Sequence, residues 1–585
     1  MRSLHSARPD APATRCPGLH ADARTFPKNT TMNEAPDELD RTLHALWGHL
    51  GGGLSPAAQM LAWSDWAIHL ATQPGRAVRA GIDGAVVQAP DPAHEPRLSG
   101  GEWDAWPFSF YRQAHEAAAH RLRTFIHGVP GVDRHHEQLV AFLARQWLEL
   151  LSPANGAITN PQVLRKAAAT GGTSLANGAM HWLEDAGRAA WGPPPAEAAS
   201  FRPGHEVALT PGKVILRNEL IELIQYAPAT PTVHAEPVLV VSAWIMKYYV
   251  LDLSPHNSLI RHLVAQGHTV FAISWKNPGA ADARLGMAEY LRLGIMASLD
   301  AVEAVLPARR VHAVGYCLGG TLMAIAAAAM ARDRDGRLAT LTLLAAQTDF
   351  TEPGELGLFI DESQLAFLED IMSRQGYLDA RQMAAAFQAL RPGELLWAPL
   401  VRNYLLGERV PMNDLMAWNA DGTRMPYRMH SDYLRSLFLD NALAEGHYLV
   451  DGRPVSLNDI DVPVFALGTR TDHVAPWRSV YKVNLLCDTE VSFVLTEGGH
   501  NAGILSEPGH PHRSHRVLKR TKNAPYLAPD EFLARSQETT GSWWPCFQQW
   551  LADHSGPRRR PPAMGSPRRG YPPIGDAPGT YVLAR

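Results

Sequence analysis

A cysteine with a glycine two residues away on either side is the strongest chemical signal in this sequence. Gly315-Tyr316-Cys317-Leu318-Gly319 has the spacing of a nucleophile elbow, with Cys in the position where many enzymes carry Ser. The β-branched run Val311–Val314 before it is typical of a buried strand, and the Ala-rich segment Thr321–Arg332 after it is typical of a helix. The sequence therefore predicts that Cys317 is a nucleophile on a sharp strand-to-helix turn.

Such a turn would support thiolate chemistry in two ways. The N-terminus of the following helix carries a partial positive charge, which favours the thiolate form of Cys317. The backbone N–H of Leu318 would be placed to donate a hydrogen bond to an oxyanion. The alternative is a buried structural cysteine on a Gly-rich turn, and the flanking strand and helix favour the nucleophile.

A cysteine nucleophile on an α/β sheet needs a carboxylate and a histidine, which follow it in that order. Asp472 lies in the loop after the apolar run Val464–Leu467, and His500 lies in a Gly-rich loop after Val491–Leu495. Both positions are those that the fold requires. The sequence therefore predicts Asp472 as the acid and His500 as the base.

Two other residues compete for these roles. His473 is the nearest competitor for the base, although one residue from Asp472 it is less able to reach across to Cys317. Asp349 is the competitor for the acid, because it follows the strand after the elbow.

The strands and helices that must position these residues are visible as alternating short apolar runs and helical stretches. The apolar runs are Val238–Val241, Thr269–Trp275, Val311–Val314, Leu341–Ala345, Val464–Leu467 and Val491–Leu495. The helical stretches include Ser258–Gln266, Met287–Val305 and Thr321–Arg332, and a hairpin is predicted from Val214–Arg217 and Leu223–Tyr226. This alternation predicts the α/β class, with a mostly parallel, doubly wound sheet.

Changes in composition predict four parts of the chain. Residues 1–40 lack periodicity and are predicted to be disordered, and residues 41–200 are predicted to form a helical N-terminal domain. Residues 201–555 are predicted to form the α/β domain, with a helical cap inserted at about 350–455. The Arg- and Pro-rich residues 556–585 are predicted to be a disordered, solvated tail.

The bulk composition excludes several classes of protein. With 585 residues, of which 46% are hydrophobic, the chain can bury a large core, and a net charge of −4 gives no reason to expect nucleic acid as a partner. No apolar run approaches the roughly 18 residues of a transmembrane segment. The first 31 residues lack the apolar core of a signal peptide, so no signal peptide is expected. The sequence leaves open whether Met1 or Met32 is the start.

The cysteines are few and irregularly spaced. They are Cys16, Cys317, Cys487 and Cys546. This usage fits a reducing cytoplasm, and it predicts no disulfide framework and no metal site.

These motifs resemble those of polyhydroxyalkanoate (PHA) synthases, which belong to the α/β-hydrolase superfamily. Gly315-Tyr316-Cys317-Leu318-Gly319-Gly320 resembles their Gly-x-Cys-x-Gly-Gly box. Similar segments extend over roughly residues 55–510 and include Trp244–Leu253, Gly267–Phe271, Ser274–Pro278, Trp418-Asn419, Asp472-His473 and Gly499-His500. The length and the helical N-terminal domain resemble the single-polypeptide class I synthases most. One departure is Val241-Ser242-Ala243, where the family tends to have Val-Pro-Pro.

The resemblance implies polymerisation of (R)-3-hydroxyacyl-CoA, with 3-hydroxybutyryl-CoA as the expected monomer, and release of CoA. An acyl-Cys317 thioester would form, with Leu318 and Ile245 as oxyanion donors, and Asp472 would orient His500 or activate the substrate hydroxyl.

The remaining expectations also come from the resemblance. Trp418 and His473 are candidate substrate contacts, and no metal or redox cofactor is expected. The protein is expected to form a homodimer. It is expected to be located in the cytoplasm and to associate with the surface of the polymer granule.

Three other functions fit some of these features. A polyester depolymerase or acyl-CoA thioesterase would use the same fold, and a non-catalytic granule protein would not need an intact Cys317, Asp472 and His500 set. A serine-type esterase is disfavoured because the elbow holds Cys.

Overall fold

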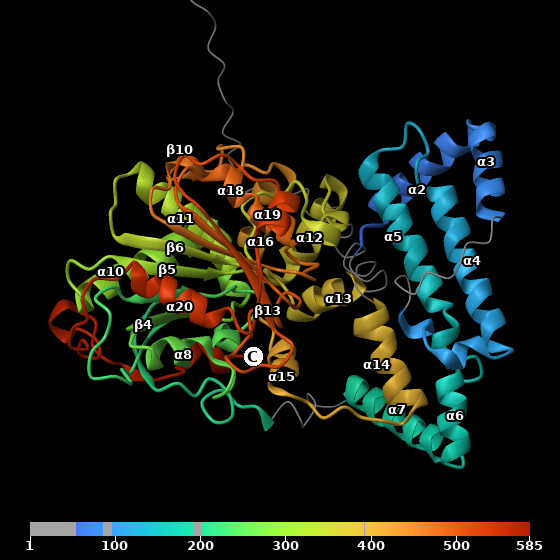
Figure 1. Ribbon diagram of the computed structural model, residues 1–585, viewed down its shortest axis with the longest axis horizontal. Coiled ribbons are helices and arrows are strands. Elements are labelled where there is room, and N and C mark those ends of the chain that lie inside the picture. The colour runs from blue at the N-terminus through green and yellow to red at the C-terminus, as the bar shows by residue number, and fades with distance from the viewer. Residues whose placement is uncertain (1–53, 86–95, 192–199, 391) are drawn as a thin grey trace, which may run out of the picture.

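A computed structural model describes residues 54–85, 96–191, 200–390 and 392–585 of the chain, so the segment predicted at 1–40 lies outside the described residues. In the described part, a sheet with the strand order β14-β13-β12-β11-β6-β5-β3-β4-β2-β1-β15 forms the centre, with helices on both of its faces (Figure 1). This confirms the predicted α/β class.

Six parallel strands form the middle of the sheet. They are β3 (Val238–Val241), β4 (Val270–Trp275), β5 (Val311–Tyr316), β6 (Leu338–Leu344), β11 (Val464–Thr469) and β12 (Val491–Thr496). Every residue in them is buried, as expected for a parallel sheet covered on both faces. Each corresponds to one predicted apolar run. Because these strands run in one direction, the loops after β5, β11 and β12 emerge at the same edge.

Antiparallel strands extend the sheet at both ends. The predicted hairpin is confirmed as β1 (Gly212–Arg217) and β2 (Ile221–Tyr226). Three further strands of the sheet were not predicted from the sequence: β13 (Ser514–Arg520), β14 (Glu538–Thr540) and β15 (Gly575–Asp576).

The prediction that residues 556–585 form a disordered tail is wrong. Strand β15 from this segment pairs with β1, and the fully buried Glu222 carboxylate accepts hydrogen bonds from the backbone N–H groups of Thr580 at 2.8 Å and Tyr581 at 2.9 Å. The segment has little apolar content of its own, but partners on β1 and β2 satisfy its backbone polar groups. Composition therefore suggested disorder for a segment whose order depends on distant residues.

Helices cover the two faces of the sheet. They are α8 (Leu259–Ala265), α9 (Met287–Glu289), α10 (Ala297–Val305), α11 (Leu318–Arg332), α17 (Trp477–Tyr481), α18 (Val483–Leu486), α19 (Pro529–Arg535) and α20 (Trp544–Asp553). Helix α11 is buried over nearly its whole length, because its alanines and glycines allow close packing against β5 and β6.

The segment between β6 and β11 is mainly helical and lies between the sheet and the N-terminal helices (Figure 1). Its helices are α12 (Glu362–Gln375), α13 (Ala380–Leu390), α14 (Ala398–Leu400), α15 (Asp414–Ala420) and α16 (Tyr427–Tyr433). The segment also contains two short pairs of antiparallel strands. In one, β7 (Tyr377–Leu378) pairs with β8 (Met425–Pro426), and in the other, β9 (Leu449–Val450) pairs with β10 (Arg453–Pro454). We call this segment the cap.

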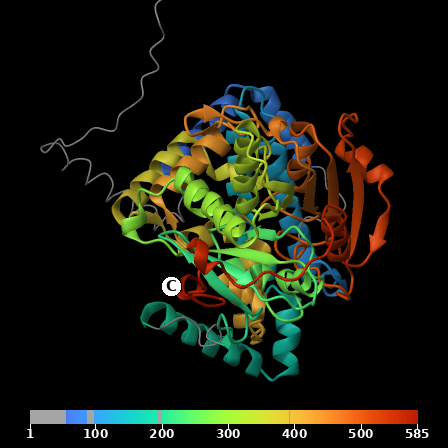
Figure 2. The same ribbon diagram turned by 90° about the vertical axis from the view of Figure 1, so that its left-hand side faces the viewer.

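The N-terminal helices form a separate group beside the cap (Figures 1 and 2). They are α2 (Pro56–Ala71), α3 (Pro74–Ala85), α4 (Phe108–Ile126), α5 (Arg134–Leu150), α6 (Pro161–Ala169) and α7 (Thr173–Trp191). Helix α2 begins at Pro56, because the Ser55 side chain accepts a hydrogen bond from Ala58 N–H and Pro56 takes the first helical position. Among the residues that the structure describes, every helix is too short or too polar to span a bilayer.

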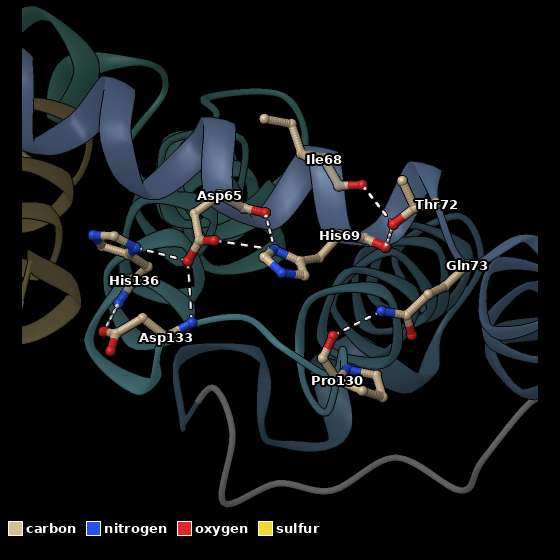
Figure 3. Close-up of polar contacts among 8 residues, drawn as sticks. All are labelled: Asp65, Ile68, His69, Thr72, Gln73, Pro130, Asp133 and His136. Atoms are coloured by element: carbon tan, nitrogen blue, oxygen red, sulfur yellow. Dashed lines mark hydrogen bonds and ion pairs between the residues drawn. The ribbon is translucent and has the colours of Figure 1, made fainter.

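Polar contacts fix α2 to the loop that precedes α5 (Figure 3). The Asp65 carboxylate accepts a hydrogen bond from Asp133 N–H at 3.0 Å and lies 2.7 Å from His136 Nδ1. The His136 contact, followed by the Asp133 bond, lowers the pKa of Asp65. Gln73, which follows the C-terminal end of α2, donates to Pro130 O at 2.7 Å. These bonds join residues that lie between 57 and 71 positions apart in the sequence.

Candidate active site

Cys317 stands at the turn between β5 and α11. Its φ of 52° and ψ of −126° lie in a region that residues with a side chain rarely adopt. The Cys317 N–H donates to Leu344 O on β6 at 2.9 Å, which holds the turn in place. The predicted strand-turn-helix around this residue is therefore confirmed.

The glycines around Cys317 are required by close packing. A Cβ atom on Gly315 would collide with the backbone of Gly320, and one on Gly319 would collide with the carbonyl oxygens of Val241 and Ser242. The loop after β3 consequently lies directly against the start of α11. This contact brings a second backbone segment close to the nucleophile.

His500 and Asp472 meet at the same edge of the sheet. His500 Nδ1 lies 2.8 Å from Asp472 Oδ2, and no part of the Asp472 side chain is exposed. The other carboxylate oxygen of Asp472 accepts hydrogen bonds from Val474 N–H at 2.8 Å and Ala475 N–H at 2.9 Å. Asp472 therefore has a fixed orientation and holds the His500 ring through Nδ1.

Electrostatics in this site favour a charged histidine. Burial by itself would lower the pKa of His500, but the Asp472 carboxylate, the Cys317 sulfur and hydrogen bonds to both raise it well above its usual value. Burial raises the pKa of Asp472, but the charge and hydrogen bond of His500 outweigh it and the net pKa is lowered. Cys317, His500 and Asp472 are thus arranged so that the thiol proton can pass to an imidazole stabilised by a carboxylate.

Asp349 and His473, the competitors for the acid and the base, do not take part in the contact between Asp472 and His500. The Asp349 carboxylate accepts a hydrogen bond from Thr351 N–H at 2.8 Å and lies 3.4 Å from Lys482 Nζ. Asp349 is therefore committed to a separate ion pair. His473 follows Asp472 in the loop, whereas the ring that contacts Asp472 Oδ2 is that of His500.

Two tryptophans that the sequence analysis did not assign support the His500 loop. The Trp543 indole donates to Gly503 O at 3.0 Å, and the Trp544 indole donates to Ile504 O at 2.9 Å. Both indoles are buried, so each bond fixes the loop from the side of α20. Their adjacency, Trp543-Trp544-Pro545, was visible in the sequence, but nothing local indicated which loop they contact.

Tyr316 and Asn501, to which the sequence assigned no role, lie beside His500. The Tyr316 hydroxyl donates to Asn501 Oδ1 at 2.5 Å, and the Tyr316 ring centroid lies 5.5 Å from that of His500. Burial, with the charges of Cys317 and Asp472, raises the pKa of Tyr316 well above its usual value, so it stays protonated. Tyr316 occupies the variable position of the elbow motif, which gave no signal for this role.

A small, mostly apolar pocket of about 80 Å³ opens beside Cys317. Its aromatic walls come from the cap and from the loop after β6, and they include Phe350, Tyr433 and Phe438. The ring centroids of Phe350 and Phe438 are 4.7 Å apart, so these rings close one side of the pocket. This pocket suits a short apolar group attached to the carbon that Cys317 attacks.

The two predicted oxyanion donors border this pocket. Leu318 is the first residue of α11, where a backbone N–H has no partner within the helix. Ile245, in the loop after β3, lines the same pocket. The Trp275 indole donates to Ser242 O at 2.9 Å, so the Ser242-Ala243 departure from Val-Pro-Pro leaves this loop anchored.

Trp418, one of the two predicted substrate contacts, is fixed within the protein. It is buried, and its indole donates to Lys247 O at 2.7 Å. Among the described residues, those that line the pocket at Cys317 include neither Trp418 nor His473. Trp418 holds the loop after β3, and a contact of Trp418 or His473 with the substrate stays a prediction.

Metal ligands do not cluster in the described residues. No group of three or more His, Cys, Asp or Glu side chains there could hold a metal ion. The groups that the site itself offers for chemistry are the side chains of Cys317, His500 and Asp472 and nearby backbone donors.

Comparison with known families matches consecutive parts of the chain. Residues 34–76 match the family described as "Poly-beta-hydroxybutyrate polymerase N terminal" and residues 94–263 match "Poly-beta-hydroxybutyrate polymerase (PhaC) N-terminus". Residues 236–507 match "alpha/beta hydrolase fold" and contain Cys317, Asp472 and His500.

Curated relatives are similar over most of their length. The poly(3-hydroxyalkanoate) polymerase subunit PhaC of Rhizobium etli is 39% identical over 500 residues, which cover 85% of this chain and 78% of the relative. The subunit of the same name from Cupriavidus necator is 36% identical over 505 residues, covering 85% and 84%.

Solved structures match more loosely. A soluble variant of monoglyceride lipase from Saccharomyces cerevisiae has a TM-score of 0.34 at 10% identity and covers 60% of this chain and 97% of its own. A monoacylglycerol lipase from Paleococcus ferrophilus has a TM-score of 0.31 at 12% identity, covering 57% and 99%. At these scores the lipases say nothing about the activity of this chain.

Proposed function

Because the chain belongs to the poly(3-hydroxyalkanoate) polymerase family, an enzyme family of acyltransferases, we propose that it polymerises (R)-3-hydroxyacyl groups from CoA thioesters with release of CoA. The observation that carries the proposal is the arrangement of Cys317, His500 and Asp472 at one edge of the sheet, with a small apolar pocket beside the sulfur.

Acylation begins at Cys317. His500 takes the thiol proton, and the sulfur attacks the carbonyl carbon of the CoA thioester. The tetrahedral intermediate collapses with cleavage of the bond to the CoA sulfur, and the proton on His500 passes to that leaving thiolate. The products are an acyl-Cys317 thioester and free CoA. Because one thioester replaces another, the step is close to isoenergetic and reversible.

Backbone donors stabilise the oxyanion of this intermediate. Leu318 N–H and Ile245 N–H are the proposed donors, since both residues border the pocket at Cys317. The cap covers the same pocket through Tyr433 and Phe438. Its apolar walls exclude water, which would otherwise hydrolyse the acyl-enzyme and end chain growth.

Elongation transfers the acyl group to a hydroxyl. The 3-hydroxyl of a monomer or of the growing chain attacks the acyl-Cys317 carbonyl, its proton passes to His500, and the Cys317 thiolate leaves. Asp472 supports this step by orienting His500 through Nδ1. This role agrees better with the geometry than direct activation of the hydroxyl, because the remaining oxygen of Asp472 is occupied by two backbone N–H groups.

The size of the pocket supports a short monomer. The pocket is small, at about 80 Å³, and its walls are mostly apolar, which favours a short side chain such as that of 3-hydroxybutyryl-CoA. Phe438→Ala removes one wall, so we expect kcat/KM for 3-hydroxyhexanoyl-CoA relative to 3-hydroxybutyryl-CoA to rise about 10-fold. Competition assays between the two thioesters measure this ratio. Phe110→Ala, at an exposed residue, serves as the control. An unchanged ratio in Phe438→Ala would show that the pocket does not determine substrate specificity.

The overall reaction is tested by following both products. Purified protein is given (R)-3-hydroxybutyryl-CoA, and CoA release and insoluble polymer are measured together. Polymer formed in proportion to CoA supports the polymerase. CoA with only free hydroxy acid would make the chain a thioesterase, and CoA-independent release of hydroxy acid from added polymer would make it a depolymerase.

Association with the polymer granule is proposed from exposed apolar side chains on the N-terminal helices. Trp147 is 64% exposed at the end of α5, and Trp182 and Leu183 are 55% and 58% exposed on α7. Large apolar side chains that are exposed on these helices favour contact with an apolar surface. We expect Trp182→Glu to lower the fraction bound to washed polymer granules at least about 3-fold. Leu449→Glu, at a residue 61% exposed on β9, is the control, and equal losses in both variants would refute a role for α7.

We also propose a cytoplasmic homodimer. Support comes from large apolar residues exposed on the cap, including Leu395 and Val410. Light scattering coupled to size-exclusion chromatography gives the mass in solution, and a monomer at all concentrations with substrate present would overturn the dimer.

A further inference from the structure

Residues 580–585, at the end of the segment first expected to be disordered, are anchored firmly to the sheet. The Glu222 carboxylate on β2 is fully buried and accepts hydrogen bonds from Thr580 N–H at 2.8 Å, Thr580 Oγ1 at 2.9 Å and Tyr581 N–H at 2.9 Å. The Tyr581 hydroxyl donates to Asn218 O at 2.6 Å. These bonds fix where the segment leaves the sheet and hence where residues 582–585 can reach.

The segment then contacts the loop after β3. Lys247 Nζ donates to Ala584 O at 2.6 Å and to Tyr581 O at 3.4 Å. Lys247 is 2% exposed, and burial lowers its pKa to about 8. A buried amine without hydrogen-bond acceptors is costly, so the two carbonyl oxygens are part of what keeps Lys247 in this position.

The same segment also contacts the cap. The Arg424 guanidinium donates to Arg585 O at 2.8 Å, and Asn277 Nδ2 donates to Ala584 O at 3.4 Å. Arg424 N–H in turn donates to Asn277 Oδ1 at 3.0 Å. In Figure 1 the end of the chain, marked C, lies next to α15, the cap helix that precedes Arg424. Residues 580–585 therefore connect the sheet, the loop after β3 and the cap.

The loop that these contacts hold is the one that carries Ile245. Its Ile245 carbonyl accepts a hydrogen bond from Thr423 N–H at 3.2 Å, and its Trp244 carbonyl accepts one from the Thr423 hydroxyl. Thr423 is adjacent to Arg424, and Trp418 from the same part of the cap binds the Lys247 carbonyl. Residues 244–247 are thus held by the cap on one side and by residues 580–585 through the Lys247 side chain.

We propose that residues 580–585 are positioning residues for the reaction: through Lys247 and Arg424 they lock the 244–247 loop against the cap, so that Ile245 N–H is aimed at the oxyanion. This inference rests on the proposed function, in which Ile245 is an oxyanion donor. The segment touches neither Cys317 nor the pocket beside it in the described contacts, so its effect passes through the loop.

The test compares the full chain with a variant that ends at Leu583 and so lacks Ala584 and Arg585. We expect kcat for CoA release to fall at least about 10-fold, with KM within about 2-fold, because a misplaced oxyanion donor affects the transition state most. The rate at which iodoacetamide alkylates Cys317 does not fall, since the thiol and His500 are unchanged. Hydrogen exchange rises at residues 243–247 and 420–426 and stays unchanged in β5 and β6.

Four further variants sharpen the test. Exposed Arg569→Ala, in the same C-terminal part of the chain, leaves kcat unchanged. Lys247→Met lowers kcat as the truncation does, and Arg424→Lys retains more activity than Arg424→Ala because it keeps a donor for Arg585 O.

Two results would overturn the proposal. One is wild-type kcat in the truncated protein. The other is a loss of kcat that comes with a lower Tm and faster exchange throughout β5 and β6, which would make the segment a general stabiliser. If the wild-type chain releases no CoA, the proposed function fails by itself, while the exchange measurements still decide whether residues 584–585 hold the loop.

Discussion

Asp472→Asn is expected to lower kcat for CoA release by about 10³- to 10⁴-fold while leaving the protein folded. An amide at this position keeps the shape but cannot stabilise the charged His500 ring, whose raised pKa depends on the carboxylate. It can also present an N–H to Nδ1, which would favour the wrong tautomer of His500. Steady-state CoA release gives kcat, and circular dichroism shows whether the fold is kept.

Asp349→Asn is the matched control for this change. Asp349 was the competing acid in the sequence, and its carboxylate lies 3.4 Å from Lys482 Nζ. We expect kcat within about 3-fold of wild type, because only a partly buried ion pair is lost. A collapse of activity in Asp349→Asn together with near-normal activity in Asp472→Asn would reverse the assignment.

Cys317→Ala is expected to abolish CoA release, with a loss of at least about 10⁴-fold. The reason is that the thioester exchange has no other nucleophile at the end of β5. Cys317→Ser should also be severely impaired, because His500 would have to deprotonate a much weaker acid. CoA release and bound polymer are measured for each variant, and full activity in the Cys317→Ser protein would revive the serine-type esterase.

The other described cysteines provide controls. Burial raises the pKa of Cys487 to about 12 and raises that of Cys546, so both remain neutral thiols. Cys546→Ala should keep wild-type kcat. A large loss in that variant would mean that the chemistry depends on a second thiol.

The parts of the fold that carried a local signal could be predicted. The strand before Cys317 is a β-branched run, its turn needs Gly315 and Gly319, and its helix is rich in alanine, so three neighbouring patterns agreed. The positions of Asp472 and His500 followed from counting loops after strands. The loops that follow parallel strands all lie at the same edge of the sheet. Residues in these loops are therefore close in space although they are far apart in the sequence.

The parts that depend on distant partners could not be predicted. Nothing near Thr580 reveals that its N–H binds Glu222, more than 350 residues earlier in the chain. Likewise, the sequence does not show that Trp543 and Trp544 face the His500 loop, or that Asp349 points to Lys482. These contacts depend on how separate elements pack against each other, and the local composition of the sequence does not indicate that packing.

The covalent acyl-Cys317 thioester is the central claim, and it can be observed directly by mass spectrometry. The protein is mixed with (R)-3-hydroxybutyryl-CoA, quenched in acid at short times and digested with trypsin, and the peptide from Val311 to Arg332 is analysed. The account predicts that this peptide gains one or more 3-hydroxybutyryl units on Cys317 and that Cys317→Ala has none. Release of CoA and growth of polymer without any adduct on Cys317, or with the adduct on another residue, would contradict it.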